Sequence, residues 1–239
     1  MTTKLDVLDR IAQVDWDMRC GELNEYGFTT IERVLTKIEC QSMIDVYSED
    51  SRFRKRIVMQ NHGYGSGEYK YFDYPLPQIT QSIRTGVYPH LVPIANLWNQ
   101  SLNIEARFPD SNIEFLERCH SAGQERPTPL ILKYQANDFN CLHQDLYGEH
   151  VFPLQLAMLL SAPEQDFTGG EFVLTEQRPR MQSRVNVVPL QQGDAVIFAV
   201  NFRPVRGTRG CYRVVMRHGV SKIRSGERFT AGIIFHDAK

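Results

Sequence analysis

The sequence predicts a mainly β fold, a sandwich or jelly roll with flanking helices and an N-terminal helical region. From Pro129 onward, short apolar segments alternate with turn residues, at a spacing typical of antiparallel sheets rather than of a parallel α/β sheet. Before about residue 125, apolar residues instead recur at helical spacing. The expected strands are residues 130–136, 139–146, 153–162, 170–176, 184–190, 194–200, 212–220 and 229–236.

Four segments of the first half carry helix signals. Residues 6–17 and 79–102 have apolar residues at helical spacing, and the second segment should be interrupted near Pro89 and Pro93. Thr36 and Ser111 each precede a glutamate by three residues and an apolar stretch, which is the pattern of a capping box.

One segment breaks this helical pattern. Residues 62–74 combine glycines with four tyrosines and a phenylalanine, and we expect a loop or short hairpin there. The expected organisation is a helical region over residues 1–125, carrying this loop, that packs on a β core over residues 126–239.

Composition narrows the class of protein. A chain of 239 residues with 42% hydrophobic residues suits one globular domain with a sizeable core. No apolar run approaches the roughly 18 residues of a membrane span, and the first residues lack the apolar stretch of a secretory signal. The five cysteines are scattered without CxxC spacing, which favours reduced thiols in a cytoplasmic protein over a disulfide framework or a zinc site.

Charge is unevenly distributed along the chain. Residues 178–228 contain eleven basic residues and two acids, about +9, although the net charge of the whole chain is −1. Five of these arginines lie between Arg203 and Arg217, directly before His218. The stretch is either neutralised by the acidic remainder of the chain, or solvated, or the docking site of an anionic substrate.

A possible metal site begins with His143 and Asp145. Residues i and i+2 of a strand point to the same side, so the imidazole and the carboxylate would emerge together. His218, in a later strand, is the best candidate for a second histidine, although a buried core histidine is the simpler interpretation of it. Two histidines and one carboxylate on one face of an iron ion form the facial triad of non-heme iron oxygenases.

Arg228 and Thr230 supply a second feature, ten residues beyond His218. They should point the same way from the last strand, where a guanidinium and a hydroxyl can hold a carboxylate. The distal carboxylate of 2-oxoglutarate would fit there, with its keto-carboxylate end on the iron.

At this point the chain resembles the iron(II)/2-oxoglutarate-dependent dioxygenase superfamily, and most closely its prolyl-4-hydroxylase-like branch. The resemblance covers residues 129–236. It is carried by Tyr134, His143-x-Asp145, Phe167-x-Gly-Gly-Glu171, Gly193-Asp-x-Val-Ile-Phe198, His218-Gly-Val220 and Gly226-x-Arg228-x-Thr230.

The resemblance implies a double-stranded β-helix, a cupin-like jelly roll, that uses Fe(II), 2-oxoglutarate and O2. It implies that His143, Asp145 and His218 are the catalytic iron ligands. It also implies that Arg228, Thr230 and Tyr134 bind 2-oxoglutarate.

The whole chain is also similar, more loosely, to bacterial oxygenases described as demethylating damaged nucleic-acid bases. It departs from the alkylated-base repair enzymes, which carry two such arginines at a longer spacing: Arg228 lies ten residues after His218, and Phe235-His236 closes the last strand without a second arginine. The core of a dioxygenase is unaffected by this difference.

Three substrate classes are compatible with the sequence: nucleic acid, a prolyl or other peptidyl side chain, and a small metabolite. Phosphates need cations and bases need stacking faces, so a nucleic-acid substrate would be contacted by Arg203, Arg206, Arg209, Tyr64 and Tyr69. A β-barrel binding module without catalysis is the alternative of a different class.

Overall fold

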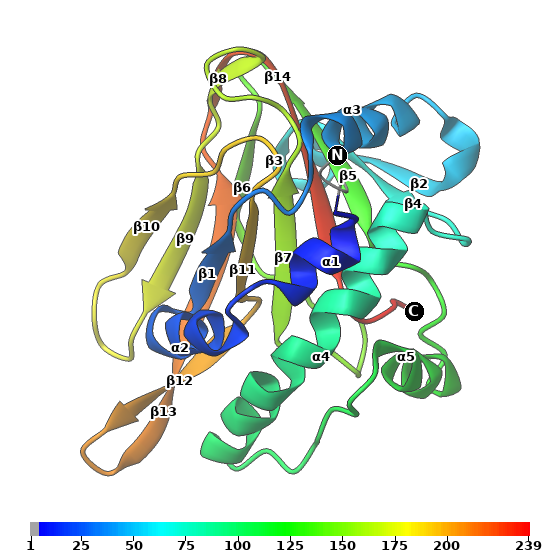
Figure 1. Ribbon diagram of the computed structural model, residues 1–239. Coiled ribbons are helices and arrows are strands. Elements are labelled where there is room, and N and C mark those ends of the chain that lie inside the picture. The colour runs from blue at the N-terminus through cyan, green and yellow to red at the C-terminus, as the bar shows by residue number, and fades with distance from the viewer. Residues whose placement is uncertain (1–4) are drawn as a thin grey trace.

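The computed structural model describes residues 5–239, which form two antiparallel sheets that face each other, with helices against one of them (Figure 1). The expected mainly β fold with N-terminal helices is confirmed. No helix among the described residues has the length and apolarity required to cross a membrane.

The larger sheet has the strand order β1-β11-β7-β14-β5-β4-β2, and β8 pairs with β14. Along β7, Leu154, Leu156 and Met158 belong to the apolar core between this sheet and the helices, whereas Ala157 and Leu159 belong to the core between the two sheets. Its strands are β1 (Phe28–Ile31), β2 (Phe53–Val58), β4 (Glu68–Phe72), β5 (Leu130–Gln135), β7 (Leu154–Leu159), β8 (Phe167–Gly169), β11 (Ala195–Ala199) and β14 (Ile223–Ile234).

The smaller sheet has the order β10-β9-β13-β6-β3, and β12 forms a hairpin with β13. Its strands are β3 (Gly65–Ser66), β6 (Phe139–His143), β9 (Phe172–Gln177), β10 (Arg184–Val188), β12 (Phe202–Gly207) and β13 (Gly210–Val220). All eight strands expected from the sequence are therefore present, and β8 and β12 are additional ones in the same half of the chain.

Helices cover the outer face of the larger sheet, where α4 lies across it (Figure 1). Thr36 forms the expected capping box, whereas Ser111 caps its helix without the reciprocal bond from Glu114. The helices are α1 (Val7–Ala12), α2 (Trp16–Tyr26), α3 (Lys37–Val46), α4 (Gln78–Ser101) and α5 (Asn112–Ser121), with short 3-10 turns at η1 (Asp50–Arg52) and η2 (Met59–His62).

Two helix expectations differ from the structure. Residues 6–17 do not form one helix, because Asp15 caps the start of a second one. Helix α4 is continuous through Pro89 and Pro93, although each proline removes one backbone N–H from the ladder. Both prolines are on the exposed side of α4, while its opposite side is fixed by packing on the sheet.

The first half of the chain is also less helical than expected. β1 pairs with β11, and β4 pairs with both β5 and β2, so strands from residues 28–72 extend the sheets built by later residues. Most of the glycine- and tyrosine-rich segment 62–74 is likewise in short strands, β3 and β4. These strands place tyrosines beside the space between the two sheets.

Candidate metal centre and adjoining cavity

Three side chains converge between the sheets at a site suited to a metal ion. His143 of β6 and His218 of β13 are paired in register, and their rings lie 4.2 Å apart. Each Nε2 atom is close to one carboxylate oxygen of Asp145, at 3.5 Å from His143 and 3.4 Å from His218. Among the described residues, this is the single group of three or more such ligands whose atoms all lie within 4.8 Å of one another.

Hydrogen bonds outside this cluster fix the orientation of its members. The Nδ1–H of His143 can donate to the carbonyl of Cys141 at 2.8 Å, which leaves the Nε2 lone pair directed at the cluster. Asp145 lies just beyond the end of β6 rather than within the strand. Its two oxygens accept from the Tyr147 hydroxyl at 2.8 Å and from Nε2 of Gln155 at 2.9 Å.

Electrostatics favour the ligand form of the carboxylate. Burial works to raise the pKa of Asp145, but hydrogen bonds and charge from both histidines outweigh it and hold that pKa well below its usual value. Two imidazole nitrogens and one carboxylate oxygen are the donor set of a facial triad, which leaves positions open for other ligands. The residues therefore fit an iron(II) ion.

A buried cation lies on β14 further into the same cavity. Arg228 is 1% exposed, and no carboxylate among the described residues pairs with it. Its Nη1 donates to Thr230 Oγ1 at 2.5 Å, whereas its Nε has no hydrogen-bond partner. Burial lowers its pKa to about 10.

This arginine has the properties of an anion site. A buried charge without a counter-ion is costly, so a carboxylate that reached the guanidinium would offset this cost. Tyr134 pairs in register with Arg228 and accepts a hydrogen bond from Asn140 at 3.2 Å. The site fits a dicarboxylate such as 2-oxoglutarate, with one end at Arg228 and the other at the metal.

The Gly-Gly turn after β8 makes room for Arg228. Gly170 has φ of +64°, and a Cβ atom there would lie 2.9 Å from Cδ of Arg228. The turn therefore contributes space to the anion site, whereas the sequence indicated only a tight turn.

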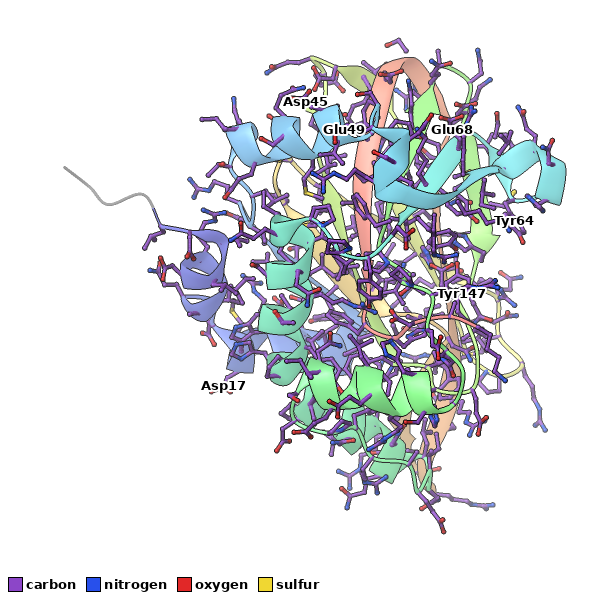
Figure 2. The ribbon with its side chains drawn as sticks, turned by 90° about the vertical axis from the view of Figure 1, so that its right-hand side faces the viewer. Asp17, Asp45, Glu49, Tyr64, Glu68 and Tyr147 are labelled. Atoms are coloured by element: carbon purple, nitrogen blue, oxygen red, sulfur yellow. The ribbon has the colours of Figure 1, made fainter. Side chains whose placement is uncertain are left out.

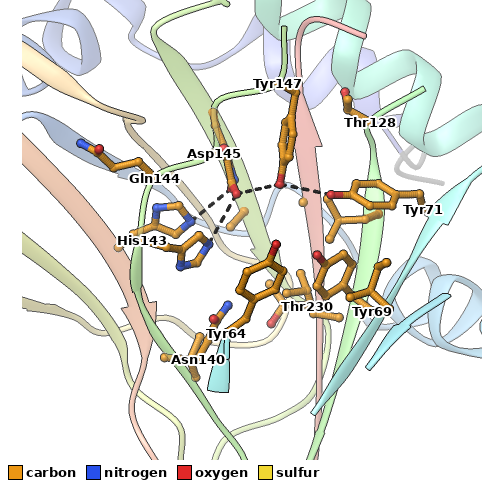
Figure 3. A pocket seen from close by; sticks show the side chains of 18 of the residues that line it. Tyr64, Tyr69, Tyr71, Thr128, Asn140, His143, Gln144, Asp145, Tyr147 and Thr230 are labelled. Carbon is orange, nitrogen blue, oxygen red and sulfur yellow. Dashed lines mark hydrogen bonds and ion pairs between the residues drawn. The ribbon is translucent and has the colours of Figure 1, made fainter. Parts of the chain in front are cut away.

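The cavity has a volume of about 510 Å³ and extends from Arg228 past the metal ligands to the surface. Four tyrosines line the cavity around the metal ligands and are called the tyrosine wall (Figure 3). The hydroxyl of Tyr71 donates to that of Tyr147 at 3.1 Å, so the tyrosine wall is linked to Asp145. Its members are Tyr64, Tyr69, Tyr71 and Tyr147.

Tyr64 and Tyr69, expected as substrate contacts, do line this cavity, but the three expected arginines do not. Arg203 is 3% exposed and forms an ion pair of 2.7 Å with Glu176, so it is a structural cation. Arg206 and Arg209 lie at the tip of the β12–β13 hairpin, which projects away from β2 and β4 (Figure 1). Nine residues of extended strand place Arg209 about 30 Å from His218.

Sequence reasoning missed other residues of the cavity. Gln155 alternates with the apolar residues of β7 that face the helices, and a polar residue inside a buried strand was the available signal. Arg54, Lys55 and Arg126 line the outer end of the cavity. Arg54 and Lys55 come from the region that the sequence assigned to N-terminal helices, and Arg126 is the first residue of the expected β core, outside every expected strand, so nothing connected them with the site.

Known proteins match this chain at the level of family and of fold. Residues 67–238 match the family model Oxygenase-NA, described as an oxygenase catalysing oxidative methylation of damaged DNA. An uncharacterized protein of Mycobacterium tuberculosis is 53% identical over 167 residues, which are 70% of this chain and 72% of that protein.

Two solved structures share the fold at low sequence identity. A prolyl hydroxylase from Trichoplax adhaerens, in complex with a hypoxia inducible factor peptide, aligns with a TM-score of 0.56 and 14% identity, covering 97% of this chain and 92% of that one. An oxidoreductase of the 2OG-Fe(II) oxygenase family from Burkholderia pseudomallei aligns with a TM-score of 0.51 and 13% identity. The alignment covers 95% of this chain and 93% of that one.

Proposed function

This chain belongs to the Oxygenase-NA family, and from that premise we propose that it is a 2-oxoglutarate-dependent iron(II) dioxygenase that removes methyl groups from alkylated bases of single-stranded nucleic acid. The proposal has two parts, the residues that hold the reactants and the substrate that is oxidised.

For the first part, His143, Asp145 and His218 would hold Fe(II), and Arg228 with Thr230 and Tyr134 would hold 2-oxoglutarate. The bound iron and co-substrate supply the insertion of one atom of O2 into a substrate C–H bond, while 2-oxoglutarate is converted to succinate and CO2 with the other atom. The unpaired charge of Arg228 supports this assignment, because it requires an anion at that depth.

For the second part, insertion of oxygen into an N-methyl group gives an N-hydroxymethyl group. Its C–N bond then breaks to release formaldehyde, and the proton of the hydroxymethyl oxygen passes to the ring nitrogen. The family description speaks of oxidative methylation, whereas oxygen insertion at a methyl group leads to its removal.

The tyrosine wall is the observation that supports a base as substrate. Four tyrosine rings line the cavity around the metal ligands, and aromatic rings stack on the faces of all bases. An enzyme acting on a base must receive it out of the helical stack, into a pocket of this kind. The volume of about 510 Å³ is within the range of roughly 300–1,000 Å³ that holds small ligands.

The test is a turnover screen of the Fe(II)-loaded protein with 2-oxoglutarate. Succinate, formaldehyde and the mass of the substrate would be measured with methylated single-stranded oligonucleotides, proline-containing peptides and a metabolite library, beside the inactive control Asp145→Ala. We expect formaldehyde in equal amount to substrate-dependent succinate, and the loss of one methyl group from the oligonucleotide.

Two outcomes would change the proposal. Substrate-dependent succinate with a proline peptide alone, accompanied by the mass of one added oxygen atom, would make the chain a peptidyl hydroxylase. The same result with a metabolite alone would make it a small-molecule hydroxylase.

A further inference from the structure

Three basic residues from β2 and from the segment before β5 line the outer end of the cavity, beside the C-terminal Lys239, and nothing in the proposed reaction uses them. Arg54 and Lys55 are consecutive residues of β2, the edge strand of the larger sheet, and Arg126 precedes β5. All three line the cavity together with the tyrosine wall. We call them the mouth cations.

The register of β2 explains why two successive residues line the same cavity. Side chains of a regular strand alternate between faces, and Ile57 and Lys55 pair with Tyr69 and Tyr71 on the cavity side. A β-bulge between Phe53 and Lys55 breaks this alternation, so that Arg54 also lines the cavity. Arg56 does not line it and instead pairs with Glu68.

The mouth cations lie close together without counter-ions. Arg54 Nε donates to the carbonyl of Pro127 at 2.8 Å, beside Arg126, and its guanidinium lies 4.5 Å above the ring of Tyr71. Within residues 5–239, none of the three forms an ion pair, although all three also line an adjoining hollow together with Asp73 and Glu125. Like charges held together in this way favour an anion between or across them.

The position of the mouth cations indicates which anion they bind. The compact dicarboxylate is accounted for by Arg228 at the deep end, so a second anion must belong to the other substrate. Lys55 and Arg126 are exposed, whereas Arg54 is half-buried and packs over the ring of Tyr71. This arrangement suits an extended anion that passes over the opening. A base held against the tyrosine wall carries its phosphates at this level.

Resting on the proposed function, we propose that Arg54, Lys55 and Arg126 bind the phosphates that flank the base, and so direct single-stranded nucleic acid into the cavity. Phosphate contacts position a nucleic acid without reading its sequence. The mouth cations would therefore decide whether the substrate is a polymer or a free base, while the cavity decides which base is oxidised.

Salt dependence of binding tests the proposal directly. We would measure the Kd of a single-stranded oligonucleotide by fluorescence anisotropy at 50 to 200 mM salt, for the parent protein and for Lys55→Ala/Arg126→Ala. Arg54 is left in place because it packs on Tyr71. Two lost phosphate contacts should flatten the slope of log affinity against log salt concentration by about 1.4. The affinity of the parent should then fall about sevenfold more than that of the variant between 50 and 200 mM salt.

Matched variants locate the effect. Arg206→Ala/Arg209→Ala removes the same charge from the remote hairpin and should leave the slope at the parent value. The charge-conserving variant Lys55→Arg/Arg126→Lys should also retain the parent slope. Equal slopes for the parent and the mouth variant would overturn the proposal, as would an equal loss in the hairpin variant or salt-dependent binding of an acidic peptide alone.

A methylated nucleoside, which has no phosphate, separates this proposal from the proposed function. The mouth variant should oxidise the nucleoside at the parent rate while losing most of its advantage on the oligonucleotide. If neither compound is oxidised by the parent, the proposed demethylation is wrong, whereas the salt slopes still decide whether the mouth cations bind phosphate. Equal oxidation of the oligonucleotide by parent and variant would show that the mouth cations have no such role.

Discussion

Arg228 combines burial with a positive charge that no ion pair within residues 5–239 neutralises. The lowering of its pKa from 12.5 to about 10 corresponds to a desolvation cost on the order of 3 kcal/mol. The protein without co-substrate carries this cost, and binding of a carboxylate removes it. If 2-oxoglutarate supplies this carboxylate, as proposed above, its affinity is obtained at the expense of stability in its absence.

Replacing Arg228 with Met should therefore change stability in opposite directions in the two states. Without 2-oxoglutarate, the free energy of unfolding in urea should rise by about 1–3 kcal/mol, because an unpaired buried charge is replaced by an apolar side chain. With saturating 2-oxoglutarate, the variant should gain no stability and the parent should gain several kcal/mol. The surface variant Arg206→Met serves as the control, and a destabilised Arg228→Met protein would contradict the account.

Tyr147 acts on the candidate metal site through Asp145. Its hydroxyl donates to one carboxylate oxygen of Asp145 at 2.8 Å. Tyr147→Phe removes this hydrogen bond, so the carboxylate should be held less firmly and metal binding should weaken by about 10–100-fold. Titration with Mn(II), followed by electron paramagnetic resonance, would measure the affinity without turnover. Tyr64→Phe is the matched control, since the Tyr64 hydroxyl has no recorded bond to a metal ligand, and equal affinities for the two variants would refute the role.

Two pairs of candidate site residues could be predicted from the sequence because their spacing is local, and His218, 75 positions beyond His143, was indicated by its place ten residues before Arg228. His143 and Asp145 are two residues apart, and Arg228 and Thr230 share one strand face. The mouth cations could not be predicted, because Arg54 and Arg126 are 72 positions apart and meet only through sheet pairing. Of the arginines that cluster in the sequence, Arg206 and Arg209 are separated from the site by most of the length of β13.

At the scale of elements, strands with several apolar residues were predictable and short polar ones were not. β7 and β11 are buried throughout, and their composition marks them. β2 has the sequence FRKRIV and β3 has two residues, so neither shows an alternation that identifies a strand. Both strands exist because edges of the larger and smaller sheets offer them backbone partners.

Helix α4 shows that packing can override a local preference. Pro89 and Pro93 lie on its exposed side, four residues apart, and each removes a hydrogen bond. Pro89→Ala and Pro93→Ala should each raise the free energy of unfolding by about 1–3 kcal/mol, measured by urea denaturation. Thr85→Ala, elsewhere on α4, controls for a general effect of alanine, and destabilisation by the proline replacements would show that the prolines shape the helix.

At the scale of the whole molecule, the free energy of unfolding should depend on pH through one buried histidine near the C-terminus, His236. His236 is 1% exposed, and burial, reinforced by the charge of Arg84, lowers its pKa to about 3. Its Nδ1 accepts from the Phe152 N–H at 3.2 Å, so protonation would also remove this bond. Because the folded-state pKa is below the unfolded value of about 6.5, stability is complete above pH 6.5 and is lost as the pH falls toward 3.

Between pH 7 and pH 5, His236 alone should cost about 2 kcal/mol of unfolding free energy. His236→Gln keeps an acceptor for the Phe152 N–H but does not titrate, so its stability should fall by that much less over the same interval. Urea denaturation at both pH values gives the difference. Parallel stability curves for the two proteins would mean that His236 does not titrate on unfolding.

The depth of Arg228 has a consequence for the order of events in a catalytic cycle. The co-substrate must travel past the mouth cations and the metal ligands to reach Arg228, and a polymer seated over the opening would obstruct that route. Turnover should then follow a compulsory sequence, with 2-oxoglutarate entering before nucleic acid and succinate leaving after it. Steady-state kinetics should show inhibition by excess oligonucleotide at low 2-oxoglutarate that disappears when 2-oxoglutarate is raised, whereas a free nucleoside, which leaves the opening clear, should not inhibit.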